Sequence, residues 1–402
     1  MYKKVVLAVI LIVIFFAGVS LATSLDRKKK DELYKQVELF SDTLAIIDTD
    51  YMDEVKPKDL IYGALKGMLA SLDPHSQFMN PDDYEELKVD TEGKFGGIGI
   101  EITLKDDLLT VITPIEDTPA WKAGLKPQDR VVKINGELTR GIDLNAAMKK
   151  LRGNPGEVVN ITVLRESEKK LLEFSITRAI IKINDIKDVK ILEDGIGYLR
   201  LIEFRENTVK DFNLAVEKLT KLKMKAFILD LRNNPGGLLE SALGVAGKFI
   251  PEGKLIVYTK GRKADQNLKF FADAKLPILD LPMAVLINEG SASGSEIVAA
   301  ALQDYKRAEI IGTKSFGKGS VQTVIPLNDG SALRLTTSKY FTPLDKVIHG
   351  KGVIPDIAVE NKVKEGADKE IIEETVRKPW DYKTDPQAMA AVNFLKNKVL
   401  KR

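Results

Sequence analysis

Two short segments carry side chains that could do covalent chemistry, and their Ser293 and Lys318 lie 25 residues apart. Residues 288–296 read Asn-Glu-Gly-Ser-Ala-Ser-Gly-Ser-Glu, and residues 316–322 read Phe-Gly-Lys-Gly-Ser-Val-Gln. The chain has no Cys and only two His, neither in a sequence context typical of catalysis. A nucleophilic reaction would therefore have to use a serine hydroxyl, and a lysine amine is the economical base.

The serine segment predicts a strand, a tight turn and a helix. An apolar run at 282–287 precedes the serines, and Ile297, Val298, Ala301 and Leu302 follow them with helical spacing. A serine at a helix N-terminus lies where free N–H groups and the helix dipole favour negative charge, which suits a nucleophile beside an oxyanion hole. The alternative is structural, because Ser293 and Glu296 also fit a capping box. This segment alone leaves both readings open.

The lysine segment begins like a phosphate-binding loop, with Gly312 and Gly317 leading to Lys318. That motif needs Ser or Thr after the lysine and then a helix, whereas this chain has Gly319 and a strand-like run at 321–326. A lysine base must instead lose its charge, which burial favours by lowering its pKa from about 10.4 toward about 7–8. Gln322 offers a neutral acceptor that could orient the amine without restoring its charge. The alternative is a solvated surface lysine.

A third segment, residues 231–237, follows a fully apolar strand and opens a helix. Its last two residues, Gly236 and Gly237, would let backbone N–H groups face a substrate, which makes the segment a candidate second oxyanion donor. A plain β-turn is the alternative, and it would be the preferred reading of this segment in isolation.

Length, composition and net charge limit the number of domains and the kinds of partner and cofactor to expect. A chain of 402 residues predicts two or three domains, and 44% hydrophobic with 30% charged residues is ordinary for a globular protein. The net charge of +3 gives no reason to expect nucleic acid as a partner. Without Cys there are no disulfides, and with two His we expect no metal and no other cofactor.

The N-terminus predicts export. A short basic start, Met1–Lys4, precedes an uncharged apolar run at 5–22 that is long enough to cross a hydrocarbon core of about 30 Å. Ser20-Leu21-Ala22 fits a signal-peptidase site, whereas an uncleaved anchor is equally compatible with the basic run at 27–30. We expect residues 1–24 to be a signal peptide or a membrane anchor of a periplasmic or otherwise extracytoplasmic protein.

Four further regions follow along the chain. Residues 28–92 have helical apolar spacing and predict an N-terminal helical region, either a simple cap or a dimerisation element. Residues 93–167 predict a small, mostly β module, with one helix at Leu144–Leu151. Strands and helices alternate over 168–360, which predicts a layered α/β domain. Residues 361–402 predict a charged extension that ends in an amphipathic helix, with Met389, Val392, Leu395 and Val399 on one face.

Together these segments resemble the carboxyl-terminal processing peptidase family, serine endopeptidases with a Ser–Lys dyad. The resemblance covers nearly the whole chain, in motif order and in spacing. It rests on residues 72–76, on 95–100, on Pro119-Ala120, Gly124-Leu125, Asp129 and Asn135-Gly136, and on 230–237, 288–296, 317–322 and 352–356.

The resemblance implies a multidomain α+β fold with a PDZ domain at 93–167 and a protease domain, at 168–360, with a layered α/β core like that of ClpP and crotonase. It assigns Ser293 as nucleophile, Lys318 as general base and Gln322 as its orienting partner. Oxyanion donors would be the N–H groups of Gly236 or Gly237 and of Gly294. The family usually has Ala at the position of Gly294, so this departure bears on the geometry and the rate.

In the PDZ domain the resemblance implies that a substrate adds as an extended strand. Its terminal carboxylate would be bound by N–H groups around Gly97, Ile98, Gly99 and Ile100, and helical positions from Leu144 to Leu151 would line the pocket for its last side chain. We therefore expect an endopeptidase that captures proteins with exposed, apolar C-termini, with an adaptor protein and a homo-oligomer left open. The alternative is a catalytically inert PDZ scaffold that binds protein C-termini.

Overall fold

The structure is a computed structural model that describes residues 31–273, 279–360 and 380–399. The expected signal peptide or anchor at 1–24 lies outside the described residues, as do residues 361–379 and 400–402 of the C-terminal extension. Among the helices that are described, none is both long and apolar enough to span a membrane.

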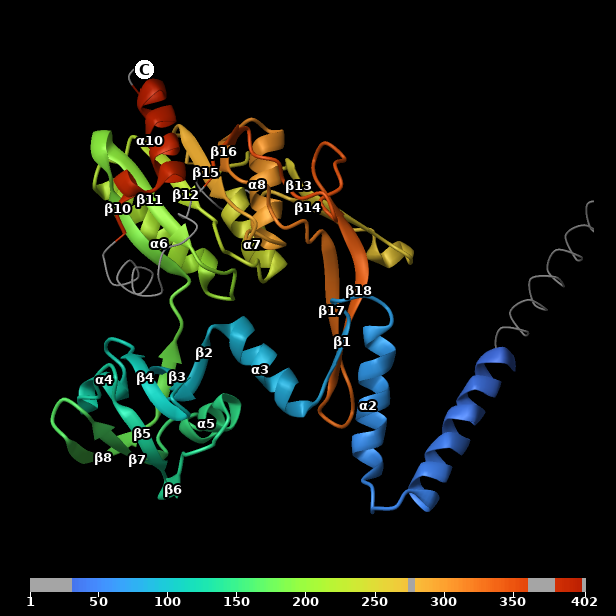
Figure 1. Cartoon of the computed structure of the whole chain (residues 1–402). Helices are drawn as coiled ribbons and strands as arrows, with labels where there is room; N and C mark the ends of the chain where they lie inside the picture. Colours follow the sequence, from blue (N-terminus) through green and yellow to red (C-terminus); the bar gives the residue numbers. More distant parts are fainter. Residues whose placement is uncertain (1–30, 274–278, 361–379, 400–402) are drawn as a thin grey trace, which may run out of the picture. The chain divides into compact units, whose positions relative to one another are not determined.

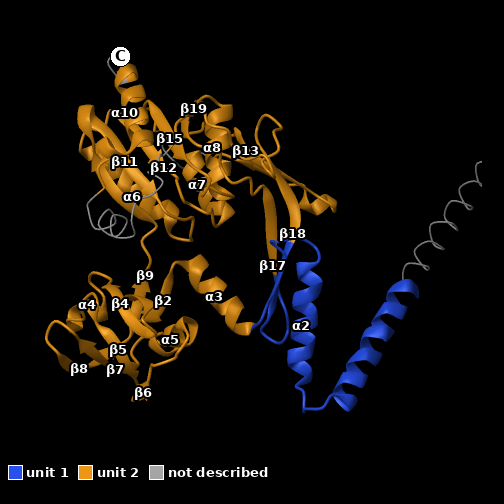
Figure 2. Cartoon of the chain, in the orientation of Figure 1, with its two compact units in different colours: residues 1–80, 325–335 blue, residues 81–324, 336–402 orange. Residues whose placement is uncertain are grey.

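The chain divides into two compact units (Figure 2), and residues 1–80 with 325–335 form the first. Within it, residues 31–50 are helical, and they precede α2 (Pro57–Ala70) and β1 (Gln77–Met79), which pairs with residues 332–334. Phe78 is buried and packs edge-on against Tyr62, whose hydroxyl donates to Asp329. In the predicted apolar stripe of the 31–50 helix, Leu33 is 63% and Val37 55% exposed, whereas Leu44 and Ile47 are partly buried.

The second unit, residues 81–324 with 336–402, contains the predicted layered α/β domain (Figure 1). Its central sheet has β10 antiparallel at one edge and parallel pairing from β11 to β19. In sheet order the strands are β10 (Ile186–Ile191), β11 (Ile196–Leu201), β12 (Ala226–Asp230), β15 (Met283–Ile287), β16 (Glu309–Gly312) and β19 (Ile357–Ala358).

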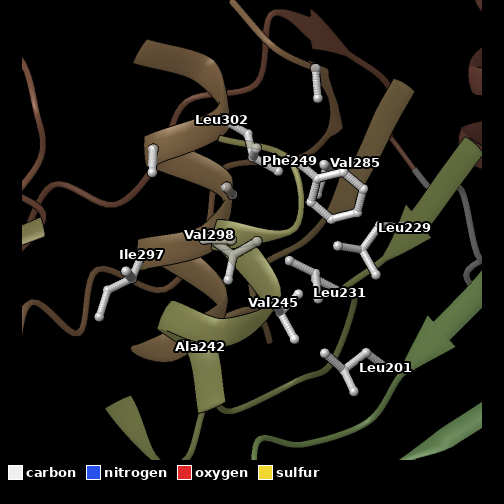
Figure 3. Packing of buried hydrophobic residues seen from close by; sticks show 14 of the residues in the cluster. Leu201, Leu229, Leu231, Ala242, Val245, Phe249, Val285, Ile297, Val298 and Leu302 are labelled. Carbon is white, nitrogen blue, oxygen red and sulfur yellow. The ribbon is translucent and has the colours of Figure 1, made fainter. Parts of the chain in front are cut away.

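Both faces of this sheet are buried, because successive side chains of each strand point to opposite faces. One face packs in a large apolar cluster with α6 (Thr208–Lys221), α7 (Leu239–Gly247) and α8 (Gly294–Asp304), part of which is drawn in Figure 3. The other face packs on α10 (Pro386–Val399), where Val392 and Leu395 are buried as predicted and Met389 is 40% exposed. The result is a three-layer arrangement in which α8 is one of the helices that cover the first face.

The predicted β module forms around a sheet with strand order β3-β4-β5-β7-β8 and its own apolar core. The expected boundary at 167 is wrong, because β8 pairs antiparallel with β7 over eight residue pairs and extends the module to Thr177. Its elements are β2 (Lys94–Gly97), β3 (Ile100–Lys105), β4 (Leu108–Pro114), α4 (Pro119–Ala123), β5 (Arg130–Ile134), β6 (Glu137–Leu138), α5 (Leu144–Leu151), β7 (Val158–Arg165), β8 (Lys170–Thr177) and β9 (Ala179–Lys182), the last pairing with β2.

The remaining strands of the second unit flank the central sheet. β13 (Leu255–Gly261) pairs with β14 (Lys269–Phe271) on one side and with residues 338–341 of β18 on the other. β18 spans Ala332–Phe341, and β17 (Ser320–Pro326) begins directly after the lysine segment, where a strand was predicted. α3 (Pro81–Glu92) leads into the β module, and short 3₁₀ turns lie at Glu193–Gly195, Ala264–Gln266 and Tyr382–Thr384.

Candidate active site

Ser293 lies at the turn between β15 and α8, where the sequence places the nucleophile. It is the residue before the first turn of α8 and is half-buried. Its backbone has φ 51° and ψ −111°, a region that non-glycine residues avoid at a cost of about 1–3 kcal/mol. A strained turn of this kind presents the serine side chain at the end of the sheet, with the N–H groups of the helix behind it.

One carboxylate joins the serine segment to the lysine segment. Glu296 Oε2 accepts hydrogen bonds from the backbone N–H groups of Ser293 at 2.9 Å and Lys318 at 2.8 Å. Its Oε1 accepts from Gly317 N–H at 2.7 Å and from Ser315 Oγ at 2.5 Å. Glu296 is fully buried, and burial raises the pKa of its carboxyl against the opposing effect of Ser315 and the N–H donors. The capping role and the catalytic role proposed for this segment are therefore compatible.

Residues 315–319, the lysine loop, are held from behind by the turn at 348–352. The Gly350 N–H donates to the Gly317 carbonyl at 2.9 Å. A side chain at Gly319 would bring its Cβ to 2.2 Å from the His349 backbone nitrogen, so only glycine allows this approach. Lys318 is half-buried between the two glycines. The Gln322 amide nitrogen donates to Ser320 Oγ at 2.9 Å, so its carbonyl oxygen is the atom that can accept from an amine.

Residues 233–237, the 233–237 turn, lie against the serine. A Cβ built on Gly236 would meet both Ser293 Cβ and the Gly294 nitrogen at 2.7 Å. The Gly236 N–H already donates to Asn234 Oδ1 at 2.9 Å. Of the two glycines that the sequence offered as oxyanion donors, Gly236 is therefore engaged in the described arrangement, and Gly237 is the better candidate.

Hydrogen bonds fasten the 233–237 turn to the serine segment. The Asn233 N–H donates to Asn288 Oδ1, and Asn288 Nδ2 donates back to Asn233 Oδ1, both at 2.8 Å. The Asn234 carbonyl accepts from Ala292 N–H and Ser295 Oγ, both at 3.0 Å, so its two partners flank Ser293 in sequence. Asn234 is fully buried, and its side chain also donates to the Leu201 carbonyl at 3.0 Å.

Gly294 has little room for a larger residue. A Cβ at this position would meet Phe204 Cδ2 at 3.2 Å, Ala242 Cβ at 3.3 Å and Gly236 Cα at 3.6 Å. Phe204 in turn pairs with the 233–237 turn, because its N–H donates to the Gly236 carbonyl and its carbonyl accepts from Leu238 N–H. The space that an alanine methyl would fill is therefore taken by the neighbours of the turn.

The predicted peptide-binding residues of the β module divide into two groups. Gly97, Gly99 and Ile100 lie at the β2–β3 connection, with Gly99 at φ 80°. Ile98 and Leu151 are instead core residues, 1% and 4% exposed, and Leu144 packs partly buried against that core.

Next to the connection is a cavity of about 440 Å³. Its lining from α5 comprises Asn145, Met148 and Lys149, none of which the sequence singled out, and Lys149 Nζ also pairs with Asp82 of α3 at 2.6 Å. No group of His, Asp or Glu in the described part of the chain is arranged to hold a metal ion.

Comparison with known proteins accounts for these parts. A carboxy-terminal-processing protease of Bartonella bacilliformis is 44% identical over 371 residues, which cover 91% of this chain and 84% of the relative. The chain belongs to this protease family. Its residues 195–359 match peptidase family S41, a family of serine-type peptidases, and residues 110–165 match the PDZ domain.

Further likenesses of this S41 protease extend to its N-terminal region. Residues 18–83 match the N-terminal domain of the activating protease CtpB. The carboxy-terminal processing protease CtpB of Bacillus subtilis is 35% identical over 336 residues, 83% of this chain and 68% of the relative. A solved S41 protease from Bacteroides fragilis shares the fold, with a TM-score of 0.51 at 18% identity over 87% of this chain and 92% of that structure.

Two residues of this protease site were missed as site residues by sequence reasoning. Glu296 was read only as a capping residue, and its position three residues after Ser293 was the available signal. Asn234 was read only as part of a turn, and nothing in the sequence distinguishes it from Asn233. Its importance follows from burial and from three-dimensional partners that lie 33 to 61 residues away.

Proposed function

We propose that this S41 protease binds exposed C-termini of protein substrates through its PDZ domain and cleaves them by a Ser–Lys acyl-enzyme mechanism. The observation that carries the proposal is the pair of hydrogen bonds at Glu296 Oε2, which bring the backbones of Ser293 and Lys318 to one atom. A residue pair 25 positions apart in sequence is thereby held as one constellation, as nucleophile and base require.

In the proposed reaction, the neutral amine of Lys318 takes the proton of Ser293 Oγ while the oxygen attacks the scissile carbonyl carbon. The carbonyl oxygen becomes an oxyanion, which the N–H groups of Gly294 and Gly237 would stabilise. The lysine then gives its proton to the leaving amine as the C–N bond breaks, and an ester to Ser293 remains. Water, deprotonated by the same amine, hydrolyses the ester and releases the new C-terminus.

Gln322 fits a supporting role in this scheme. An oriented amide oxygen accepts a hydrogen bond from the amine without adding a negative charge, which would favour the protonated lysine. The half-buried position of Lys318 supports the same purpose, because partial desolvation disfavours the ammonium form.

The decisive experiment compares Ser293→Ala and Lys318→Ala with Lys314→Ala in the full chain. Lys314 is an exposed lysine just before the lysine loop and serves as the matched control. We expect both site variants to lose proteolysis of an unfolded protein substrate by at least about 1,000-fold, the scale of lost nucleophile or base, while the control keeps its activity. Full activity of Lys318→Ala would refute the mechanism. Peptide binding without turnover by the unmodified chain would instead favour the inert scaffold.

The role proposed for the PDZ domain is tested on the substrate. A peptide with a free, apolar C-terminus and the same peptide with an amidated C-terminus differ only in the group that the Gly97–Gly99 connection would bind. Amidation should raise KM at least about tenfold, because it removes a charge-assisted interaction with backbone N–H groups. Equal KM values would place recognition elsewhere.

We also propose export through residues 1–24 and assembly through the exposed apolar stripe of the 31–50 helix. An isolated helix with Leu33, Val37 and Phe40 facing water gains little from its own hydrogen bonds, so a protein partner is favoured, either an adaptor or a second copy. Cell fractionation with N-terminal sequencing tests the first proposal. Light scattering of the chain and of a Phe40→Glu variant tests the second, and an unchanged mass that is monomeric in both would refute self-association.

A further inference from the structure

Arg232 lies directly before the 233–237 turn, and its guanidinium is enclosed between two carboxylates. On one side Nε and Nη2 donate to Asp230, at 2.9 Å to Oδ1 and 2.5 Å to Oδ2. On the other side Nη1 donates to Asp385 Oδ1 at 2.9 Å, and Nη2 lies 2.7 Å from Asp385 Oδ2. Arg232 is 8% exposed, Asp230 is fully buried and Asp385 is 9% exposed. Both pairs have the two-point geometry that a guanidinium fork prefers.

Asp385 connects this arginine to the C-terminal helix, 153 residues away in sequence. It stands directly before α10, and its Oδ1 accepts from the N–H groups of Gln387 and Ala388 at 3.1 Å. Gln387 adds a further acceptor, its Oε1, to Arg232 Nη1 at 3.0 Å. Trp380 Nε1 donates to Asp385 Oδ2 at 3.1 Å. The N-terminal end of α10 therefore offers Arg232 three side-chain acceptors, the two carboxylate oxygens of Asp385 and Gln387 Oε1.

The arrangement constrains the residue directly before the 233–237 turn. A buried guanidinium that loses one of its carboxylates keeps its charge and must seek other acceptors, which is costly in a desolvated site. The backbone N–H of Asn233, the next residue, donates to Asn288, and Asn234 binds residues on both sides of Ser293. A rotation of Arg232 away from α10 would therefore be passed directly to the residues that set the distance between the turn and the nucleophile.

We infer that Asp385 is a positioning residue for the peptidase reaction, acting through Arg232 on the 233–237 turn. Asp385 contacts no reacting atom, and its effect is to fix the turn that carries Gly237, the proposed oxyanion donor. The inference rests on the proposed Ser–Lys mechanism. It makes the C-terminal helix a part of the active-site framework.

The test uses Asp385→Asn in the full chain, with Asp381→Asn as the matched control. Asp381 belongs to the same segment and also accepts a backbone N–H, that of Lys383 at 3.0 Å, but it is exposed. We expect Asp385→Asn to lower kcat at least tenfold with KM within twofold, since the amide presents a donor to the guanidinium. A serine-directed peptide phosphonate should label Ser293 more slowly by the same factor. Asp385→Glu, which keeps the charge, should recover part of both rates, and the control should stay within twofold of the unmodified chain.

The possible results distinguish a failure of the role inferred for Asp385 from a failure of the proposed Ser–Lys mechanism. Unchanged kcat and labelling rate in a folded Asp385→Asn protein would overturn the inference while leaving the Ser–Lys mechanism intact. Failure of the phosphonate to label Ser293 in the unmodified chain would count against the mechanism itself. If Asp385→Asn does not fold, Gln387→Met keeps a similar volume and removes one acceptor of Arg232, together with the hydrogen bond that Gln387 Nε2 donates to the Val359 carbonyl. It should lower kcat about two- to fivefold with KM unchanged, and a rise in KM with kcat unchanged would contradict the inference.

Discussion

The replacement of Gly294 by Ala tests how tightly the 233–237 turn and the serine segment are packed. The new methyl would lie 3.2 Å from Phe204 Cδ2 and 3.3 Å from Ala242 Cβ, closer than the usual contact of about 3.5–4.0 Å. Forcing one methyl into a packed site costs about 1–3 kcal/mol. Replacing a glycine whose backbone suits alanine returns about 0.4–1 kcal/mol through the unfolded chain. We expect a net destabilisation of about 1 kcal/mol, within limits of about 0 and 2.6 kcal/mol from the same two ranges.

Ala242→Gly supplies the compensating change, because it removes one of the two closest contacts. In a double-mutant cycle the two substitutions should couple favourably by at least about 0.5 kcal/mol, the lower end for residues in contact. The kcat of Gly294→Ala should fall as well, and the addition of Ala242→Gly should restore part of it. Since Phe204 pairs with the 233–237 turn, a shift of a few tenths of an ångström there should lower kcat of Gly294→Ala about three- to tenfold, a fraction of the effect of a 1 Å misplacement.

The assay exploits the two tryptophans of the chain, Trp121 in the PDZ domain and Trp380 in the protease domain. In a Trp121→Phe background, urea unfolding followed by the fluorescence of Trp380, which stacks on Tyr198 of the central sheet, reports on the protease domain alone. A separate signal matters because a multidomain chain does not unfold in one step. Additive effects of the two substitutions, or a more stable and fully active Gly294→Ala, would refute the packing argument.

Two further predictions concern buried carboxylates. Glu296→Gln should destabilise the protease domain by about 2–6 kcal/mol and abolish turnover. The amide nitrogen would face two of the four donors now bound by the carboxylate, at about 1–3 kcal/mol each, and urea unfolding with a peptide assay measures both effects. For Asp385, burial raises the pKa of the carboxyl, but Arg232 outweighs it and holds the pKa below its ordinary value. The stability from this pair is therefore full above about pH 4 and lost as the pH falls below it, so unfolding midpoints at pH 5 and pH 3 should differ less in Asp385→Asn than in the unmodified chain.

Local patterns predicted the elements that carry the site. The apolar run ending at Ile287 and the helix beginning at Gly294 were read from the sequence, because a buried parallel strand and a capped helix both leave strong local signals. The α5 helix at Leu144–Leu151 was likewise predicted with its observed bounds. The boundary at 167 failed although Leu172, Phe174 and Ile176 alternate as in a half-buried strand, because the sequence does not tell which neighbour that strand pairs with.

The relations between elements were beyond the reach of the sequence. Leu151 fits a helix face, but no periodicity tells whether that face meets the module core or a peptide, and it meets the core. Asp385 lay in a charged extension with no sign of its partner Arg232. Gly236 and Gly237 look equivalent in sequence, and only the hydrogen bond from Gly236 to Asn234 distinguishes them. Each of these depends on tertiary contacts, which override local preference.

The four hydrogen bonds at Glu296 also determine the stage of folding at which the chain can become proteolytically active. The donors come from the start of α8 and from the lysine loop, so the carboxylate is satisfied only after both segments have docked. A partly folded chain would therefore lack the proposed arrangement of Ser293 and Lys318 and should be inactive. In refolding experiments, proteolysis should therefore return only when the native fluorescence of the protease domain is fully recovered. Proteolysis by an earlier folding intermediate would contradict this expectation.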